Sequence, residues 1–230
     1  MAQAPYVGDR RPRVDNIFDY LYDEISTLRL RPGDKISEAE IAARFGVSRQ
    51  PVRDAFSRLA NLDLLLIRPQ RATEVMRFSM REIEKSRFVR ASVEKEVLQR
   101  AAKHCDAAGG AKLDACLKRQ DYVIEAGDLV GFGALDYAFH ETLCEIAKAD
   151  FAFEVIWVEK SKVDRLCRLG LSKEARMLDL VADHREIADA VKAHDAERAV
   201  KAGVLHLSRL DETIEQISEM NASYFINKDA

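Results

Sequence analysis

Residues 45–59 read Phe45-Gly46-Val47-Ser48-Arg49-Gln50-Pro51-Val52-Arg53-Asp54-Ala55-Phe56-Ser57-Arg58-Leu59. This stretch predicts the turn and the second helix of a helix-turn-helix. Gly46 is expected to provide the tight turn, where a side chain would clash. Ser48 is placed to cap the following helix, and Pro51 falls in its first turn, where a missing N–H costs no hydrogen bond. Apolar residues recur at helical spacing and predict the buried face: Val52, Ala55, Phe56 and Leu59.

The polar side chains of this stretch predict a surface that binds double-stranded DNA. Arg49, Gln50 and Arg53 face outward near the N-terminal end of the helix, and in this motif that end enters the major groove. A guanidinium can bind guanine or a phosphate through two parallel hydrogen bonds. We expect Arg49 and Arg53 to contact bases or phosphates, with Ser48 and Gln50 next. Phosphate contacts are expected from three further arginines, Arg44, Arg58 and Arg71.

A second stretch upstream strengthens this interpretation. Residues 28–42 read Leu28-Arg29-Leu30-Arg31-Pro32-Gly33-Asp34-Lys35-Ile36-Ser37-Glu38-Ala39-Glu40-Ile41-Ala42. Together with residues 45–59 they resemble the winged helix-turn-helix of GntR-family bacterial transcription regulators, over roughly residues 14–77. The resemblance implies binding to operator DNA. The family usually has glycine where Asp63 and Ala72 stand, so the shape of the wing stays open.

Length and composition indicate a two-domain, helix-rich soluble protein. The 230 residues are 47% hydrophobic, 33% charged and 7% aromatic. Residues 1–78 carry 13 basic and 11 acidic side chains, whereas the remainder carries 23 and 28. A basic module joined to an acidic remainder is typical of a DNA-binding domain fused to another function. Ordinary solvated arginines are the alternative.

Several classes of protein are excluded by the sequence. No run approaches the roughly 18 apolar residues that span a bilayer, so we expect no membrane association. The N-terminus lacks the apolar segment of a signal peptide, and we expect a cytoplasmic protein. Residues 1–13 are expected to form a flexible arm, which either touches the DNA backbone or is a solvated tail. The cysteines are scattered without metal-binding spacing and are expected to be reduced packing residues.

The chain predicts a mainly α fold with an N-terminal winged helix-turn-helix and a C-terminal antiparallel all-α bundle. In the first domain, residues 14–77, helices are expected at 14–29, 38–45 and from 49 to about 59, followed by a hairpin wing with strands at 64–67 and 73–75. Residues 76–81 form the expected linker. The second domain, residues 78–230, is expected to contain six helices: 80–104, 110–126, 129–147, 151–169, 174–193 and 196–220.

One aspartate and three histidines in the second domain predict a metal site. Asp136 and His140 are four residues apart and share a helical face. His184 and His206 are expected in the middle of later helices, beside apolar neighbours. Side chains that point into a bundle from facing helices are where metal sites are built. Three imidazoles and a carboxylate suit a divalent ion and leave room for an exogenous ligand. Hydrogen-bonded histidines on separate helices are the alternative.

A second resemblance bears on these residues. Asp136-x-x-Phe139-His140, the later Asp183-His184-Arg185-Glu186-Ile187 and a final-helix histidine resemble the FCD ligand-binding domain of the FadR branch of the GntR family, in its six-helix VanR-like form. The match covers about residues 80–220. It implies that Asp136, His140, His184 and His206 bind a divalent metal. From the donor set we expect zinc, with nickel, iron or manganese as alternatives. The resemblance also implies a small carboxylate effector beside the ion.

Arg90, Cys144 and the pair His104 and His194 are further candidates for this site. The resemblance places Arg90 at the effector cavity, where a guanidinium could bind a carboxylate, whereas the residues alone allow an exposed ion pair with Glu94. Cys144 lies four residues after His140 and could add a thiolate, but an inert buried cysteine is expected. His104 and His194 are expected at helix C-termini, in structural roles.

The function expected from these patterns is a homodimeric, effector-responsive transcription regulator, more often a repressor in this family. Three rivals remain open. The metal itself could be the signal. The metal could be purely structural. The site could also be that of a metal-dependent hydrolase or lyase, but no general base with distinctive spacing accompanies it, so no catalysis is expected.

Overall fold

The computed structural model describes residues 14–169 and 173–226. It divides into two compact units: one comprises the residues up to Phe78 together with those from Ser223 onward, and the other comprises Ser79–Ala222. The expected N-terminal arm at 1–13 and the expected helix break at 170–172 lie outside the described residues.

The first unit begins with three helices, α1 (Val14–Ser26), α2 (Glu38–Phe45) and α3 (Arg49–Asn61). Their apolar residues recur every three or four positions and point into one shared core. Ile17, Leu21 and Ile25 of α1 are fully buried and pack with Val52 and Phe56 of α3. Burying these side chains is the main driving force for packing α1 against α3. The outer face of α3 is thereby left to its polar residues.

The turn between α2 and α3 differs in two details from the sequence expectations. Gly46 has φ 65°, the left-handed conformation, yet a Cβ at this position would meet no atom within 4 Å. The turn therefore favours glycine because of its backbone conformation and not because of a clash. Ser48 does occupy the N-cap of α3, but its side chain makes no capping hydrogen bond. The capping expected of Ser48 is wrong, and its exposed hydroxyl stays available to another partner.

The wing is a small antiparallel sheet of order β1-β3-β2, made of β1 (Lys35–Ile36), β2 (Leu65–Leu66) and β3 (Thr73–Val75). The sequence predicted the hairpin of β2 and β3 but not β1, whose two residues are too few for a recognisable pattern. Asp63 has φ 55° and Gln70 has φ 58°. Asp63 therefore takes the left-handed conformation that glycine favours at this position, and Gln70 takes it near the tip of the wing.

The C-terminal residues return to the first unit. The amide of Phe78 donates to the carbonyl of Tyr224 (2.9 Å), and the amide of Ile226 donates to the carbonyl of Phe78 (2.8 Å). Phe78 and Phe225 also pair their rings at 5.6 Å, and the Arg77 guanidinium donates to the Ser223 carbonyl. The expected second domain of 78–230 is therefore too long at its C-terminal end, because residues 223–226 pair with the end of the wing.

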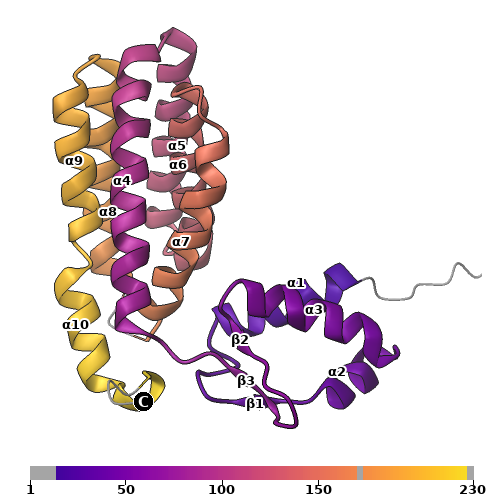
Figure 1. Ribbon diagram of the computed structural model, residues 1–230. Coiled ribbons are helices and arrows are strands. Elements are labelled where there is room, and N and C mark those ends of the chain that lie inside the picture. Colours follow the sequence, from indigo (N-terminus) through magenta and orange to yellow (C-terminus); the bar gives the residue numbers. More distant parts are fainter. Residues whose placement is uncertain (1–13, 170–172, 227–230) are drawn as a thin grey trace, which may run out of the picture. The chain divides into compact units, whose positions relative to one another are not determined.

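The second unit is a helical bundle (Figure 1). Its described helices are α4 (Met80–His104), α5 (Ala107–Glu125), α6 (Leu129–Ile146), α7 (Phe151–Cys167), α8 (Lys173–Lys192), α9 (Ala196–Ser208) and α10 (Asp211–Met220), followed by the short 3-10 turn η1 (Ala222–Tyr224). None of the described helices is long and apolar enough to cross a membrane.

Two boundaries in the bundle correct the prediction of six helices. The helix predicted at 110–126 starts three residues earlier, because α5 begins at Ala107 and the Asp106 side chain accepts a hydrogen bond from the amide of Gly109. The predicted last helix is two helices, α9 and α10, which separate at Arg209 and Leu210. His206 consequently lies in the last turn of α9 and not in the middle of a helix.

Candidate metal centre

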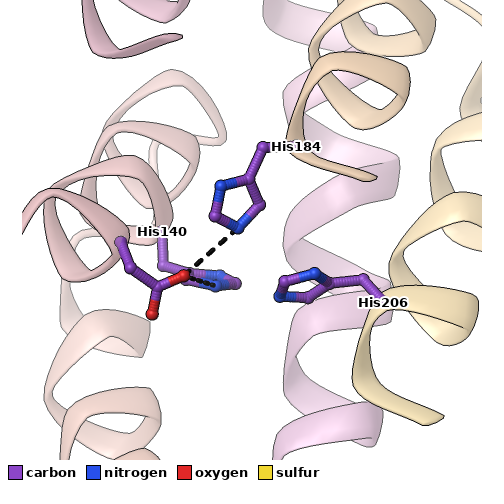
Figure 2. Close-up of side chains that lie close together, drawn as sticks. His140, His184 and His206 are labelled. Atoms are coloured by element: carbon purple, nitrogen blue, oxygen red, sulfur yellow. Dashed lines mark ion pairs between the residues drawn. The ribbon is translucent and has the colours of Figure 1, made fainter. Parts of the chain in front are cut away.

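The four residues singled out in the sequence lie together inside the bundle. Asp136 and His140 come from α6, His184 from α8 and His206 from α9. One potential ligand atom from each lies within 4.8 Å of the others. All four side chains are buried, with at most 6% of the residue surface exposed. Figure 2 shows the three imidazoles turned toward a common point beside the carboxylate.

The protonation of His184 follows from its neighbours. Nε2 of the Gln120 amide donates to the carbonyl of Leu135 (3.1 Å), so Oε1 of the same amide is the atom that faces Nδ1 of His184 at 3.0 Å. Because an amide oxygen only accepts, Nδ1 of His184 must carry the proton. Nε2 of His184 then presents a lone pair toward the centre of the cluster.

Two acceptors thus face each other in a buried space. Nε2 of His184 lies 3.2 Å from Oδ1 of Asp136 and makes no hydrogen bond with any described residue. Burial lowers the pKa of His184 to about 4, so a proton does not fill this gap at neutral pH. Burial alone would raise the pKa of Asp136, but the Lys160 ammonium group beside Oδ2 holds it well below its usual value, so the carboxylate is charged. A lone pair facing a buried carboxylate is unfavourable unless a cation lies between them, so these two atoms fit a divalent ion.

Like His184, His140 has a polar partner at Nδ1 that leaves its Nε2 facing the cluster. Its Nδ1 lies 3.1 Å from Oε2 of Glu94, while its Nε2 points toward Oδ1 of Asp136 at 4.0 Å and has no hydrogen bond. Burial would raise the pKa of Glu94, but Arg90 and His140 lower it well below its usual range. A carboxylate behind Nδ1 fixes the imidazole tautomer with Nε2 free for coordination, as in many metal sites.

The donor set of the cluster fits a borderline divalent ion. Three imidazole nitrogens and one carboxylate oxygen suit zinc, and nickel or iron as well. Metal ligands must be unprotonated, and burial lowers the pKa of His206 as it does that of His184. Cys144 is not part of the cluster. Burial raises the pKa of its thiol to about 12, so it stays a protonated packing residue, as expected.

Arg90 is connected to the cluster through Glu94, which contacts His140. It is buried, so the alternative of an exposed ion pair with Glu94 is wrong. It is 4% exposed, and its Nε donates to Oε1 of Glu94 (2.9 Å), so the expected ion pair forms in a buried setting. Arg90 also lines a cavity of about 200 Å³ between α4, α7 and α9. Arg87 and Lys95 contribute to the same walls, which are otherwise mainly apolar. The cavity therefore combines cationic groups with apolar surface.

Comparison with known proteins gives the family of the chain. Residues 13–75 match the family of bacterial regulatory proteins named gntR, and residues 86–209 match the FCD domain. The HTH-type transcriptional repressor RspR of Escherichia coli K12 is 33% identical over 98% of this chain and 99% of its own length. The chain belongs to the GntR family.

Other relatives of this GntR-family protein agree in fold and naming. A probable D-xylose utilization operon transcriptional repressor of Paenarthrobacter nicotinovorans is 29% identical and is matched over 83% of each chain. Among solved structures, E. coli McbR/YncC superposes with a TM-score of 0.71 at 19% identity, covering 88% of this chain and 97% of the other. A putative GntR regulator from Rhodococcus sp. RHA1 superposes with a TM-score of 0.70 at 23% identity, covering 89% and 96%. The two structures support the shared fold.

The candidate DNA-contact residues of this GntR-family chain are all exposed. Arg49 makes no ion pair or hydrogen bond with another described residue, whereas Arg53 pairs with Glu38 (2.9 Å) and Gln50 donates to Asp54 (2.9 Å). The other arginines differ in their surroundings: Arg44 stacks on Tyr20, Arg58 pairs with Asp15 and stacks on Phe18, and Arg71 is exposed in the wing loop. Arg49 is therefore the α3 arginine most available to a nucleic acid.

Sequence analysis did not identify two residues that contact the cluster, Gln120 and Lys160. Nζ of Lys160 lies 2.6 Å from Oδ2 of Asp136, and the side chain is buried. A signal for Lys160 existed, because it lies four residues after Ile156 and three before Val163, both buried on the inner face of α7. Gln120 carried no comparable signal, since a single glutamine in an amphipathic helix is usually a surface residue.

Proposed function

We propose that this protein is a transcriptional repressor whose operator affinity is set by a small carboxylate bound at a divalent metal ion, with zinc the leading candidate. The proposal rests on two observations. Nε2 of His184 lies buried at 3.2 Å from Oδ1 of Asp136 with no proton between them, and Nε2 of His140 is buried without a hydrogen-bond partner among the described residues. The ion would be held by Asp136, His140, His184 and His206, and would supply a Lewis-acidic site for an anionic ligand.

The surroundings of the ion favour a carboxylate as the ligand. Arg90 lines the cavity between α4, α7 and α9, and a guanidinium binds a carboxylate through two parallel hydrogen bonds. Arg90 is held by Glu94, which also contacts His140. A carboxylate that enters the cavity would compete with Glu94 for Arg90, so the effector could change the packing of α4.

The course of the chain supports a route from this site to the DNA-binding unit. The helix α4, which carries Arg90 and Glu94, begins two residues after Phe78, the last residue of the wing domain. The helix α9, which carries His206, leads through α10 to Ser223 and the segment that pairs with Phe78. A ligand regulates only if it binds the DNA-competent and DNA-incompetent states with different affinity, and both routes end at Phe78.

We further propose that the protein acts as a homodimer on operator DNA in the cytoplasm. Helix-turn-helix dimers read two-fold symmetric sites, and one α3 helix contacts only a single half-site. Arg49 and Arg53 are proposed to contact bases, supported by Ser48 and Gln50. Three arginines, Arg44, Arg58 and Arg71, are proposed to contact phosphates. Light scattering of the full chain in solution tests the oligomeric state, and a monomer at micromolar concentration would contradict it.

The experiment for the regulatory proposal starts from an operator selected out of random-sequence DNA by the full-length protein. Operator affinity is then measured for the metal-free protein, the zinc form and the zinc form with each of a panel of organic acids. We expect at least one acid to change the affinity of the zinc form several-fold and to leave the metal-free protein unaffected. Zinc alone changing the affinity would instead favour metal sensing, and an acid effect that survives loss of all four ligands would contradict the proposal.

A further inference from the structure

The two carboxylate oxygens of Asp136 have different surroundings. Oδ1 faces the imidazoles, at 3.2 Å from Nε2 of His184 and 4.0 Å from Nε2 of His140. Oδ2 faces the other way and lies 2.6 Å from Nζ of Lys160. The carboxylate is therefore divided between a histidine cluster on one side and a buried ammonium group on the other.

Lys160 is held firmly in this position. Its Nζ donates to Oδ2 of Asp164 at 2.6 Å and lies 4.2 Å above the ring of Tyr137. The side chain is thus an ammonium ion with two carboxylates and an aromatic face around it, and a buried ammonium of this kind is expensive to move.

We propose that Lys160 restricts Asp136 to a single metal–oxygen bond and so keeps coordination positions open for the effector. The inference rests on the proposed metal site and adds a residue that determines how the site is filled. A carboxylate whose second oxygen is held by an ammonium group is disfavoured from chelating an ion through both oxygens, because the ammonium charge repels the ion and turns that oxygen away from it. The same ammonium withdraws charge from Asp136 and lowers its attraction for a cation.

This restriction bears on the class of effector. Three imidazole nitrogens and one carboxylate oxygen fill four coordination positions. An ion that prefers octahedral geometry then has two positions left, which an exogenous ligand can occupy with two of its atoms. A bidentate Asp136 would take one of those positions. Lys160 therefore favours effectors that chelate, such as carboxylates with a neighbouring hydroxyl or second carboxylate group, over those that bind through one oxygen.

The test compares zinc affinity among variants of the full-length protein, measured by competition with a chromophoric chelator. Lys160→Met keeps most of the length of the side chain but removes its charge and its hydrogen bonds. We expect it to bind zinc several-fold tighter than the wild type, because the ammonium charge no longer opposes the cation and Oδ2 of Asp136 becomes free to coordinate it. The matched control is Lys112→Met, which breaks an exposed pair with Glu145 and should leave the affinity unchanged.

A second readout separates coordination from general stability. Cobalt(II) replaces zinc in such sites, and its visible spectrum reports the coordination geometry. We expect the spectrum of Lys160→Met to differ from that of the wild type because Asp136 gains a second bond to the ion. A purely structural role of Lys160 would leave the spectrum of the folded variant unchanged, which would contradict the inference.

Two further variants keep the inference testable if Lys160→Met does not fold. Lys160→Gln retains a hydrogen-bond donor without charge and should also bind zinc tighter than the wild type. Asp164→Asn removes the competing partner of Lys160, so Asp136 is held more strongly and zinc should bind several-fold weaker. Equal or weaker zinc binding by folded Lys160→Gln would overturn the role of Lys160. A wild-type protein that binds no zinc, nickel or iron would overturn the metal site itself.

Discussion

Gln120 and His184 form a buried pair in which Oε1 of the amide lies 3.0 Å from Nδ1 of the imidazole. The carbonyl of Leu135 fixes the amide from its other end, so the pair has only one possible polarity. As a result, α5 determines which nitrogen of a histidine on α8 points to the centre of the cluster. In the proposed metal site, a residue that does not touch the ion would therefore control the tautomer of one of its ligands.

Replacing Gln120 by leucine should weaken metal binding without removing a ligand. The variant leaves Nδ1 of His184 without an acceptor, so the imidazole can rotate or change tautomer. We expect the zinc affinity to fall about ten-fold, as for other residues behind metal ligands. Isothermal titration with zinc measures the change, and Gln99→Leu on the exposed side of α4 is the control. Equal affinity of both variants and the wild type would contradict the role of Gln120.

Replacing Arg49 by alanine should weaken operator binding. Arg49 is exposed at the start of α3 and has no partner among the described residues, so its truncation costs the free protein little. We expect a loss of about 1–3 kcal/mol in operator binding and a flatter sequence preference if Arg49 binds a base through two hydrogen bonds. Fluorescence anisotropy with operator and scrambled DNA measures both effects. Arg100→Ala, on α4 of the helical unit, should bind like the wild type.

Replacing Phe225 by alanine should loosen the C-terminal segment from the wing domain. The variant removes the ring contact with Phe78 but no backbone group. We expect the amides of Phe78 and Ile226, which hydrogen-bond across the two segments, to exchange with deuterium faster than in the wild type. The exposed Phe88 of α4 supplies the control variant Phe88→Ala. Unchanged exchange at both amides in Phe225→Ala would show that the ring contact does not hold the segment.

The metal-free protein should lose stability in acid through His184. Burial lowers the pKa of this imidazole from 6.5 to about 4 in the folded protein, so between these values the unfolded chain binds a proton that the folded chain does not. The free energy of unfolding should therefore decrease as the pH falls from about 6.5 to about 4, by up to about 3 kcal/mol from this group. Urea unfolding at a series of pH values measures it.

The pH prediction has its own internal control. A His184→Gln variant lacks the titrating group, so its stability should depend less on pH over the same interval than that of the wild type. Bound zinc should move the loss of stability to lower pH, because protons then compete with the ion for the imidazole. A wild type and variant with the same pH dependence would show that His184 is not the group responsible.

The sequence predicted those features that depend on local signals. Gly46, Pro51 and the apolar spacing of α3 are all short-range, and they located the helix-turn-helix correctly. The separation of four residues between Asp136 and His140 correctly predicted that they share one face of α6. Two other histidines reach the same point because of the bundle packing, which no local pattern specifies.

The features that sequence analysis missed depend on long-range contacts or weak local signals. No proline or glycine marks the break at Arg209 and Leu210, where Arg209 turns to pair with Asp183 of α8. The two residues of β1 acquire their strand only by pairing with β3. Lys160 and Gln120 contact residues of the cluster that are 24 and 64 positions away in the sequence, so their roles become visible only in three dimensions.

The central claim is that one divalent ion is held by Asp136, His140, His184 and His206. X-ray data collected on either side of the zinc absorption edge, from crystals of the zinc-loaded full-length protein, test it most directly. The account predicts an anomalous peak bonded to one oxygen of Asp136 and to one nitrogen of each imidazole. Loaded crystals with no peak among these four side chains, or with the imidazoles turned to other partners, would contradict it.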